Sequence, residues 1–180
     1  MSEKEEKMNI VFILTDDLGW TDLNCYGSDI YETPNLDKLA EEGMKFTDAY
    51  AACTVCSPTR ASIMTGRYPA RLNLTNWISG HNFDNTKMKE PDWTKYLSLD
   101  EETIASRLKN EGYKTAHIGK WHLGDKPYYP ENHGFDINIA GCDWGAPVKG
   151  YFSPWEIPTL ENEQEGKYLT DHLTGSAIDF

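Results

Sequence analysis

The sequence predicts a layered α/β fold, an α/β/α sandwich with helices on both faces of a mostly parallel mixed sheet. Strand-like and helix-like segments alternate along the chain, which is the order expected of such a fold. The first strand-like segment is a continuous apolar run, typical of a parallel strand buried on both faces. A length of 180 residues and a hydrophobic content of 39% suit one globular core, so we expect one domain or part of one.

The first predicted elements are a strand, a helix and a second strand. Residues 10–14 are uniformly apolar and form the first strand. Residues 33–43 open with threonine and proline and close with glycine, which are the signals of helix ends. Residues 44–52 follow as a strand that leads toward Cys56, whereas the charged residues 1–7 are predicted to be disordered.

The next elements are two helices and a strand. Pro58 suits the first position of a helix, because its missing N–H costs nothing there. A second helix covers residues 104–108, with Asp100 as its cap and Gly112 at its end. A short strand begins at Tyr113, which extends the alternation of elements.

Two long segments carry little secondary-structure signal. Residues 72–99 are polar and irregular, and they include Trp77, His81 and Trp93. A loop of this length usually serves a site, so we expect it to shape a substrate pocket. Residues 128–166 are rich in aromatic residues and proline and are also predicted to be irregular.

Charge and hydropathy exclude two classes of partner. The net charge of −12 comes without a basic cluster, which argues against nucleic acid. The longest apolar stretch is far too short to cross a bilayer, so no membrane partner is expected. The first seven residues lack the pattern of a signal peptide, so the chain as given is predicted to be cytoplasmic.

An oxyanion site is predicted where the helix of Pro58 begins. Cys56 lies just before this helix and faces its positive end, which favours an anion. Arg60 lies on the first turn and adds forked donors that match the oxygens of a sulfate or phosphate ester. Taken alone, these residues also fit a small buried thiol and a solvated arginine.

A metal site is predicted at the end of the first strand. Asp16 and Asp17 follow the apolar run, at the edge where open α/β sheets place their ligands. Adjacent carboxylates supply the hard oxygen donors that Ca²⁺ or Mg²⁺ prefers. The alternative is a solvated turn after the strand.

Lys120 and His122 are the third group of candidate site residues. They follow the strand that begins at Tyr113. Residues two apart in an extended chain share a face, so both side chains converge on one pocket if strand geometry continues that far.

The cysteines permit another interpretation. Cys53 and Cys56 have C-x-x-C spacing, which suits a redox pair or half of a zinc site. No second C-x-x-C or paired histidine site accompanies them. Cys25, Cys53 and Cys142 are therefore predicted to be structural.

Three segments in order resemble motifs of the type I, formylglycine-dependent sulfatases. They are residues 9–20, residues 56–69 with the pattern C-x-P-x-R, and residues 119–124 with the sequence Gly-Lys-Trp-His-Leu-Gly. The resemblance is to arylsulfatase-like members of the alkaline phosphatase-like superfamily. It implies an incomplete alkaline phosphatase-like fold, in which residues 1–180 form the N-terminal portion of a sulfatase catalytic domain.

The resemblance also implies a mechanism for sulfate-ester hydrolysis. Cys56 is oxidised to formylglycine, whose hydrate attacks sulfur, expels the alcohol and forms a sulfate ester on residue 56. Asp16, Asp17 and residue 56 hold Ca²⁺, with Mg²⁺ as the alternative. Arg60 and Lys120 stabilise the negative charge of the transition state, and His122 takes up a proton.

The implied partners are a sulfate ester, with sulfated carbohydrate as the expected class, and a formylglycine-generating or sulfatase-maturating enzyme. Two alternatives stay open: a phosphonate or phosphate monoester hydrolase of the same superfamily, and a truncated noncatalytic fragment with an anion pocket. Residues 168–180 begin a helical pattern that stops without a terminating signal, and no match to the distal metal and sulfate ligands is recognisable. We therefore expect a fragment that is inactive by itself.

Overall fold

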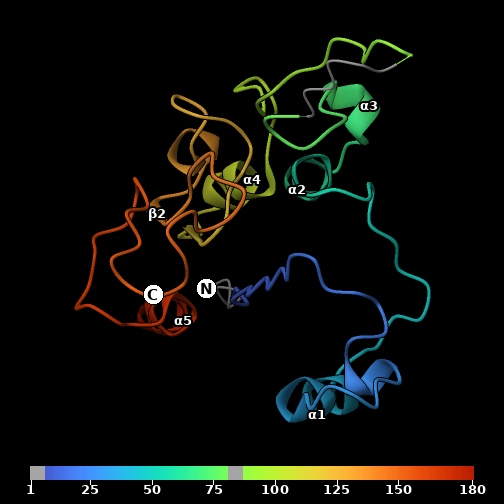
Figure 1. Ribbon diagram of the computed structural model, residues 1–180, viewed down its shortest axis with the longest axis vertical. Helices are drawn as coiled ribbons and strands as arrows, with labels where there is room; N and C mark the ends of the chain where they lie inside the picture. Colours follow the sequence, from blue (N-terminus) through green and yellow to red (C-terminus); the bar gives the residue numbers. More distant parts are fainter. Residues whose placement is uncertain (1–6, 81–86) are drawn as a thin grey trace, which may run out of the picture. The chain divides into compact units, whose positions relative to one another are not determined.

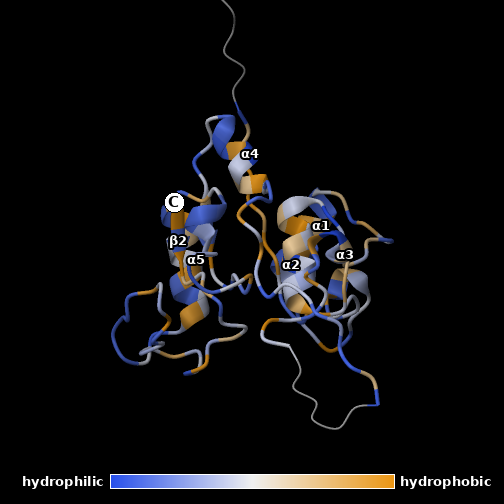
Figure 2. Ribbon diagram, turned by 90° about the horizontal axis from the view of Figure 1, so that it is seen from above, coloured by the Kyte–Doolittle hydropathy of each residue, from blue (hydrophilic) through white to orange (hydrophobic). Residues whose placement is uncertain are grey.

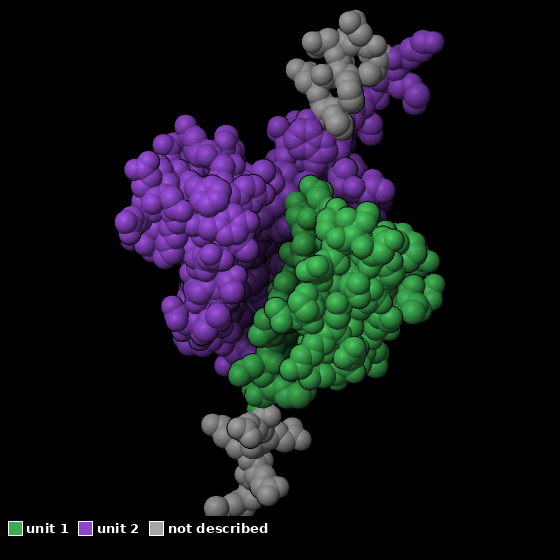
Figure 3. Space-filling model, turned by 60° about the horizontal axis from the view of Figure 1, so that its bottom comes forward, with its two compact units in different colours: residues 1–50 green, residues 51–180 purple. Residues whose placement is uncertain are grey.

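A computed structural model describes residues 7–80 and 87–180. The chain separates into two compact units, unit 1 with residues 1–50 and unit 2 with residues 51–180 (Figure 3). His81 lies outside the described residues, and so do residues 1–6 of the segment predicted to be disordered. Lys7 is the one residue of that segment that the structure describes.

Within its described residues, unit 1 contains one short 3-10 helix, η1 (Asn24–Tyr26), and one α-helix, α1 (Pro34–Glu42) (Figure 1). Helix α1 confirms the helix predicted from its terminal proline and glycine signals. A hydrogen bond from the main-chain N–H of Cys25 to Asp37 Oδ1, at 2.8 Å, links η1 to α1. No residue of α1 is buried, and its apolar Leu39 is 62% exposed. The ribbon of Figure 2, coloured by hydropathy, shows apolar as well as polar residues along this helix.

The strands predicted at residues 10–14 and 44–52 are absent from the described part of unit 1, so both predictions are wrong. Val11 and Phe12 are 84% and 63% exposed. A β-strand forms only when its main chain is hydrogen-bonded to a neighbouring strand. An apolar run favours strand conformation but does not itself provide that neighbouring strand.

Unit 2 contains the sheet, which consists of two parallel strands in the described part of the chain: β1 (Ala116–Ile118) and β2 (Ile137–Ile139). Ala116 pairs with Ile137, and Ile118 with Ile139. Helix α5 (Leu169–Asp179) contacts β1 and confirms the predicted C-terminal helix. The α/β class is thus confirmed, with a narrower sheet than the sequence predicted.

Helix α4 (Ile104–Asn110) confirms the helix predicted at 104–108. Its cap is Thr103 rather than the predicted Asp100. The Thr103 hydroxyl accepts from the main-chain N–H of Ser106 at 3.1 Å, and the Ser106 hydroxyl accepts from that of Thr103 at 2.9 Å. This reciprocal capping box satisfies the main-chain N–H groups of Thr103 and Ser106. Asp100 lies farther from the start of the helix and is not its cap.

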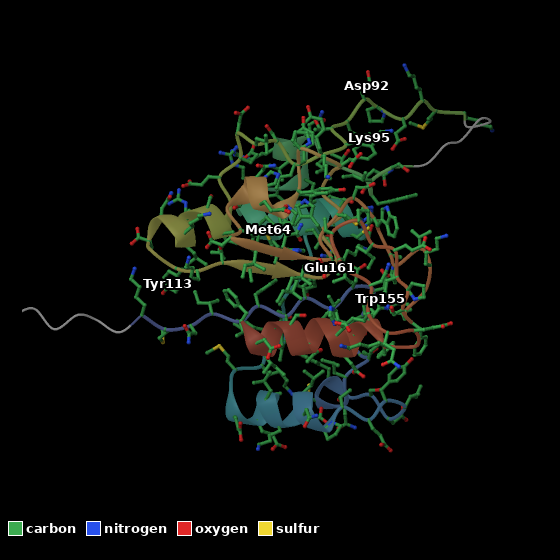
Figure 4. All side chains as sticks on the ribbon, turned by 90° about the vertical axis from the view of Figure 1, so that its left-hand side faces the viewer. Met64, Asp92, Lys95, Tyr113, Trp155 and Glu161 are labelled. Carbon is green, nitrogen blue, oxygen red and sulfur yellow. The ribbon has the colours of Figure 1, made fainter. Side chains whose placement is uncertain are left out.

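The core of unit 2 consists of two clusters of buried side chains. Trp155, labelled in Figure 4, is fully buried in the first cluster. Its ring lies 5.1 Å from that of His172 on α5. The first cluster comprises Tyr129, Ala140, Cys142, Trp155, Ile157 and Leu169. The second comprises Ala61, Leu74, Leu97, Trp121 and Leu123. The second cluster holds both chain neighbours of His122.

Unit 2 also contains helix α2 (Cys56–Thr65), the short helix α3 (Pro69–Leu72) and the turn η2 (Pro130–His133). Across the described ranges, 7–80 and 87–180, no helix is long and apolar enough to span a bilayer.

Candidate active site

Helix α2 (Cys56–Thr65) positions the predicted oxyanion residues. Its N-cap is Val55, so Cys56 is the first helical residue and Pro58 the third, two positions later than predicted. Proline fits here as well, because the first turn of a helix has N–H groups without intrahelical partners. Cys56 and Arg60, four residues apart, lie on the same face of α2.

The structure brings Cys56 and His122 together across 66 residues of sequence, with Cys56 Sγ 3.3 Å from His122 Nδ1. The His122 side chain is buried, and its Nε2 contacts the carbonyl oxygen of Ile78. A carbonyl only accepts hydrogen bonds, so Nε2 carries a proton. In the neutral ring, Nδ1 then presents its lone pair to residue 56.

The main chain at His122 is left-handed, with φ of 57°. Its N–H donates to the carbonyl oxygen of Cys142 at 2.9 Å, which fixes this uncommon conformation. Strand β1 ends at Ile118, and Gly119 has φ of 103°. Strand geometry therefore does not extend to Lys120 and His122, and the condition under which their side chains were expected to share a face is not met.

Arg60 lies in the interior, with 9% of its surface exposed. Its Nη1 donates to the carbonyl oxygen of Lys120 at 2.6 Å. This bond ties helix α2 to the segment that carries His122. Lys120 thus joins the site through its main chain, while a role for its ammonium group stays a prediction.

Two further histidines, His117 and His133, lie beside Trp121, the residue that precedes His122. Burial lowers the pKa of His117 to about 4, and the positive charge of Arg60 adds to the effect. Burial also lowers the pKa of His133 to about 4. Trp121 lies between them, with its ring 5.1 Å from that of His117 and 5.3 Å from that of His133. Both histidines are therefore neutral near pH 7.

These histidines predict a loss of stability in acid. Their pKa values lie near 4 in the folded chain and near 6.5 in the unfolded chain, so the unfolded chain binds more protons between these limits. The unfolding free energy is then highest above pH 6.5 and falls as the pH drops toward 4. Thermal unfolding between pH 7.5 and 4 measures this, and His133→Phe, which keeps an apolar ring, should weaken the dependence. A midpoint that stays constant down to pH 4 would contradict it.

Asp16 and Asp17 form a turn in unit 1, where Asp17 has φ of 56°. Their carboxylates suit Ca²⁺ or Mg²⁺ in chemistry, but Ca²⁺ takes about six to eight oxygen ligands. The described residues contain no cluster of three or more His, Cys, Asp or Glu side chains able to hold a metal. The pair therefore supplies only part of a coordination shell. Unit 1 is described by itself, so the structure does not relate this turn to residue 56.

All four cysteines are free thiols, including Cys53 and Cys56. Cys142 lies in the first core cluster, as a structural cysteine should. Burial raises its pKa to about 11, which keeps the thiol protonated and unreactive.

Two site residues carry no sequence signal. Ile78 contributes a main-chain carbonyl, and Gly145 packs against the His122 ring through the absence of a side chain. Neither contribution depends on a functional group that a motif would reveal. Only the position of Ile78 in the predicted pocket-forming loop 72–99 pointed toward it.

The fold and site define an α/β protein with a helix-start cysteine, a buried arginine and a histidine, an arrangement suited to an oxyanion. The Sulfatase family model matches residues 8–180, and the chain belongs to the sulfatase family. Mouse (Mus musculus) arylsulfatase G is 48% identical over 142 residues, which cover 74% of this chain and 25% of that protein. Human (Homo sapiens) steryl-sulfatase is 42% identical over 158 residues, covering 80% and 26%.

Solved structures agree with this membership. The structure of BT4656 in complex with its substrate D-glucosamine-2-N,6-O-disulfate has a TM-score of 0.73 and 32% identity. The match covers 97% of this chain and 31% of that chain. The chain spans about a quarter of the length of the curated relatives named above.

Proposed function

We propose that the complete protein hydrolyses sulfate esters at residue 56. Membership of the sulfatase family supports the reaction class. The observation that carries the proposal is the 3.3 Å contact between Cys56 Sγ and His122 Nδ1. The contact supports the proposal, because nucleophilic catalysis requires a proton acceptor beside the nucleophile.

Maturation of Cys56 to formylglycine would supply a hydroxyl nucleophile from the aldehyde hydrate. The surroundings of Cys56 suit this group, because it lies at the start of α2 with His122 Nδ1 beside it. His122 is held by its Nε2–H bond to the Ile78 carbonyl, so Nδ1 can take up a proton from a hydroxyl on residue 56. A maturation enzyme is then a required partner.

Positive charge at the site comes from Arg60 and, by prediction, Lys120. Arg60 is fixed by its bond to the Lys120 carbonyl oxygen, which reduces the reorganisation needed when an anion binds. With the chain at a net charge of −12, such local cations must dominate at short range to attract a sulfate group.

Asp16 and Asp17, with residue 56, would hold Ca²⁺, or Mg²⁺ in its place. Bound there, the metal would act as a Lewis acid toward the sulfate oxygens and the hydroxyl of residue 56. The two carboxylates suit this ion in donor type and need further oxygen ligands to complete its shell.

Sulfated carbohydrate is the substrate class we propose. Support comes from BT4656, whose substrate in the solved complex is a disulfated glucosamine. The site residues described above are proposed to act on the sulfate group, so other parts of the protein must select the sugar.

The test uses the complete protein coexpressed with a formylglycine-generating enzyme. We expect it to hydrolyse an aryl sulfate and a sulfated glucosamine, to lose activity after chelation of divalent metal, and to recover it with Ca²⁺. Phosphate and phosphonate monoesters, assayed in parallel, should turn over more slowly. Hydrolysis of those esters alone would replace the proposal by the neighbouring hydrolase, and anion binding without turnover would support a noncatalytic role.

A further inference from the structure

The imidazole of His122 is enclosed on a third side by Gly145. A Cβ atom at position 145 would lie 2.8 Å from Cε1 of His122, 3.1 Å from Nε2 and 3.3 Å from Nδ1. The first distance is shorter than real Cβ contacts allow, and the ring would have to move. The other two sides of the ring meet Cys56 Sγ and the Ile78 carbonyl.

We propose that Gly145 is a positioning residue, whose missing side chain lets the His122 ring lie against residue 56. The proposal rests on the proposed function for its effect on turnover, because it acts through the nitrogen that faces the nucleophile. It also predicts a contact that can be measured without any substrate.

The ring has no easy way to yield to a larger residue at position 145. Trp121 and Leu123, the chain neighbours of His122, are 1% and 0% exposed in the second core cluster. The main-chain N–H of His122 is bonded to the carbonyl oxygen of Cys142, three residues before Gly145. The main chain on the His122 side of the contact is therefore held in place, and a Cβ at position 145 would press on the His122 side chain.

The need for glycine is steric and does not come from the backbone. Gly145 is not among the glycines with positive φ, so an alanine fits its main-chain conformation. Gly175 on α5 offers a matched control, since nothing lies within 4 Å of a Cβ built there and its φ is also not positive.

We expect Gly145→Ala to lower kcat of the complete, matured protein about 100-fold, because a displacement of about 1 Å at a reacting group has an effect of that size. KM should change little, since His122 is proposed to act on residue 56 rather than to bind the substrate. Gly175→Ala should leave both constants unchanged. Equal activity of Gly145→Ala and the parent protein would overturn the proposal.

A double-mutant cycle separates positioning from a general structural role. In a protein that already carries His122→Ala, the space of the ring is empty, so Gly145→Ala should cause no further loss of activity. Losses that simply multiply would overturn the proposal. If Gly145→Ala alone fails to fold, rescue of folding by His122→Ala supports the same steric contact, and failure of the double variant to fold contradicts it.

A spectroscopic test is independent of sulfate turnover. The imidazole resonances of His122 in unmatured protein should shift when Cys56 is replaced by serine, because the two side chains are in contact. In Gly145→Ala this shift should be lost, while Gly175→Ala should keep it. A shift that persists in Gly145→Ala would overturn the positioning role, whereas an absence of sulfate hydrolysis would affect only the proposed function.

Discussion

Replacement of Cys56 by alanine should abolish sulfate-ester hydrolysis by the complete, matured protein. The expected fall in kcat is on the order of 10⁶-fold, as for removal of the nucleophile from other hydrolases. Alanine has no sulfur for the maturation enzyme to oxidise, so no aldehyde and no hydroxyl nucleophile form at residue 56. Alanine also favours helix, and the start of α2 should be preserved. Circular dichroism and thermal unfolding should therefore match those of the parent protein.

Cys53→Ala is the matched control. Cys53 lies three residues earlier, is a free thiol and is also only partly buried. Its main-chain carbonyl accepts from the Thr59 hydroxyl at 2.8 Å, and alanine retains that bond. Full activity is expected, with the mass spectrum of the peptide showing aldehyde at residue 56. Comparable losses in both variants would instead indicate a redox pair, and retained activity in Cys56→Ala would contradict the mechanism.

Helices were predictable from the sequence because their signals are local. Pro34 and Gly43 bound α1 almost where the pattern placed it, and the apolar spacing around Leu173 predicted α5. Strands depend on a partner elsewhere in the chain. The apolar run at residues 10–14 has the composition of a strand, but its pairing is not encoded within it.

The candidate site, like the fold, was predictable from the sequence only in part. The motifs identified Cys56 and His122 as candidates, and their contact is a consequence of the fold. Continued strand geometry, the condition under which Lys120 and His122 were expected to share a face, is not met, because β1 ends at Ile118. A left-handed turn at His122 and the bond of its N–H to the Cys142 carbonyl position it instead. Main-chain partners such as the carbonyl of Ile78 cannot be predicted from residue type, because nearly every residue carries the same main-chain groups.

The second large effect is expected for Arg60→Lys, which keeps the positive charge and removes the planar fork. Arg60 uses Nη1 to bind the Lys120 carbonyl oxygen at 2.6 Å, a bond that fixes the orientation of its planar guanidinium. A lysine ammonium has neither this planar fork nor the same reach. We expect kcat/KM for an aryl sulfate to fall about 10²- to 10³-fold, the usual effect of losing one oriented charge-stabilising donor.

Stability should fall as well, because Arg60 is buried and its bond to the Lys120 carbonyl links α2 to the segment that carries His122. The loss of this bond should lower the unfolding free energy by about 1–3 kcal/mol, measured by urea denaturation. Activity must therefore be assayed well below the unfolding midpoint of the variant.

Arg67→Lys is the control for charge and general structure. Arg67 lies just beyond the end of α2, with 56% of its side chain exposed, and forms a 3.1 Å ion pair with Glu101. Lysine keeps a positive charge opposite Glu101, whose side chain is 17% exposed, so both activity and stability should be nearly unchanged. If Arg60→Lys behaved like Arg67→Lys, positive charge alone would suffice at the site. Catalysis would then not depend on the guanidinium geometry that the bond to the Lys120 carbonyl fixes.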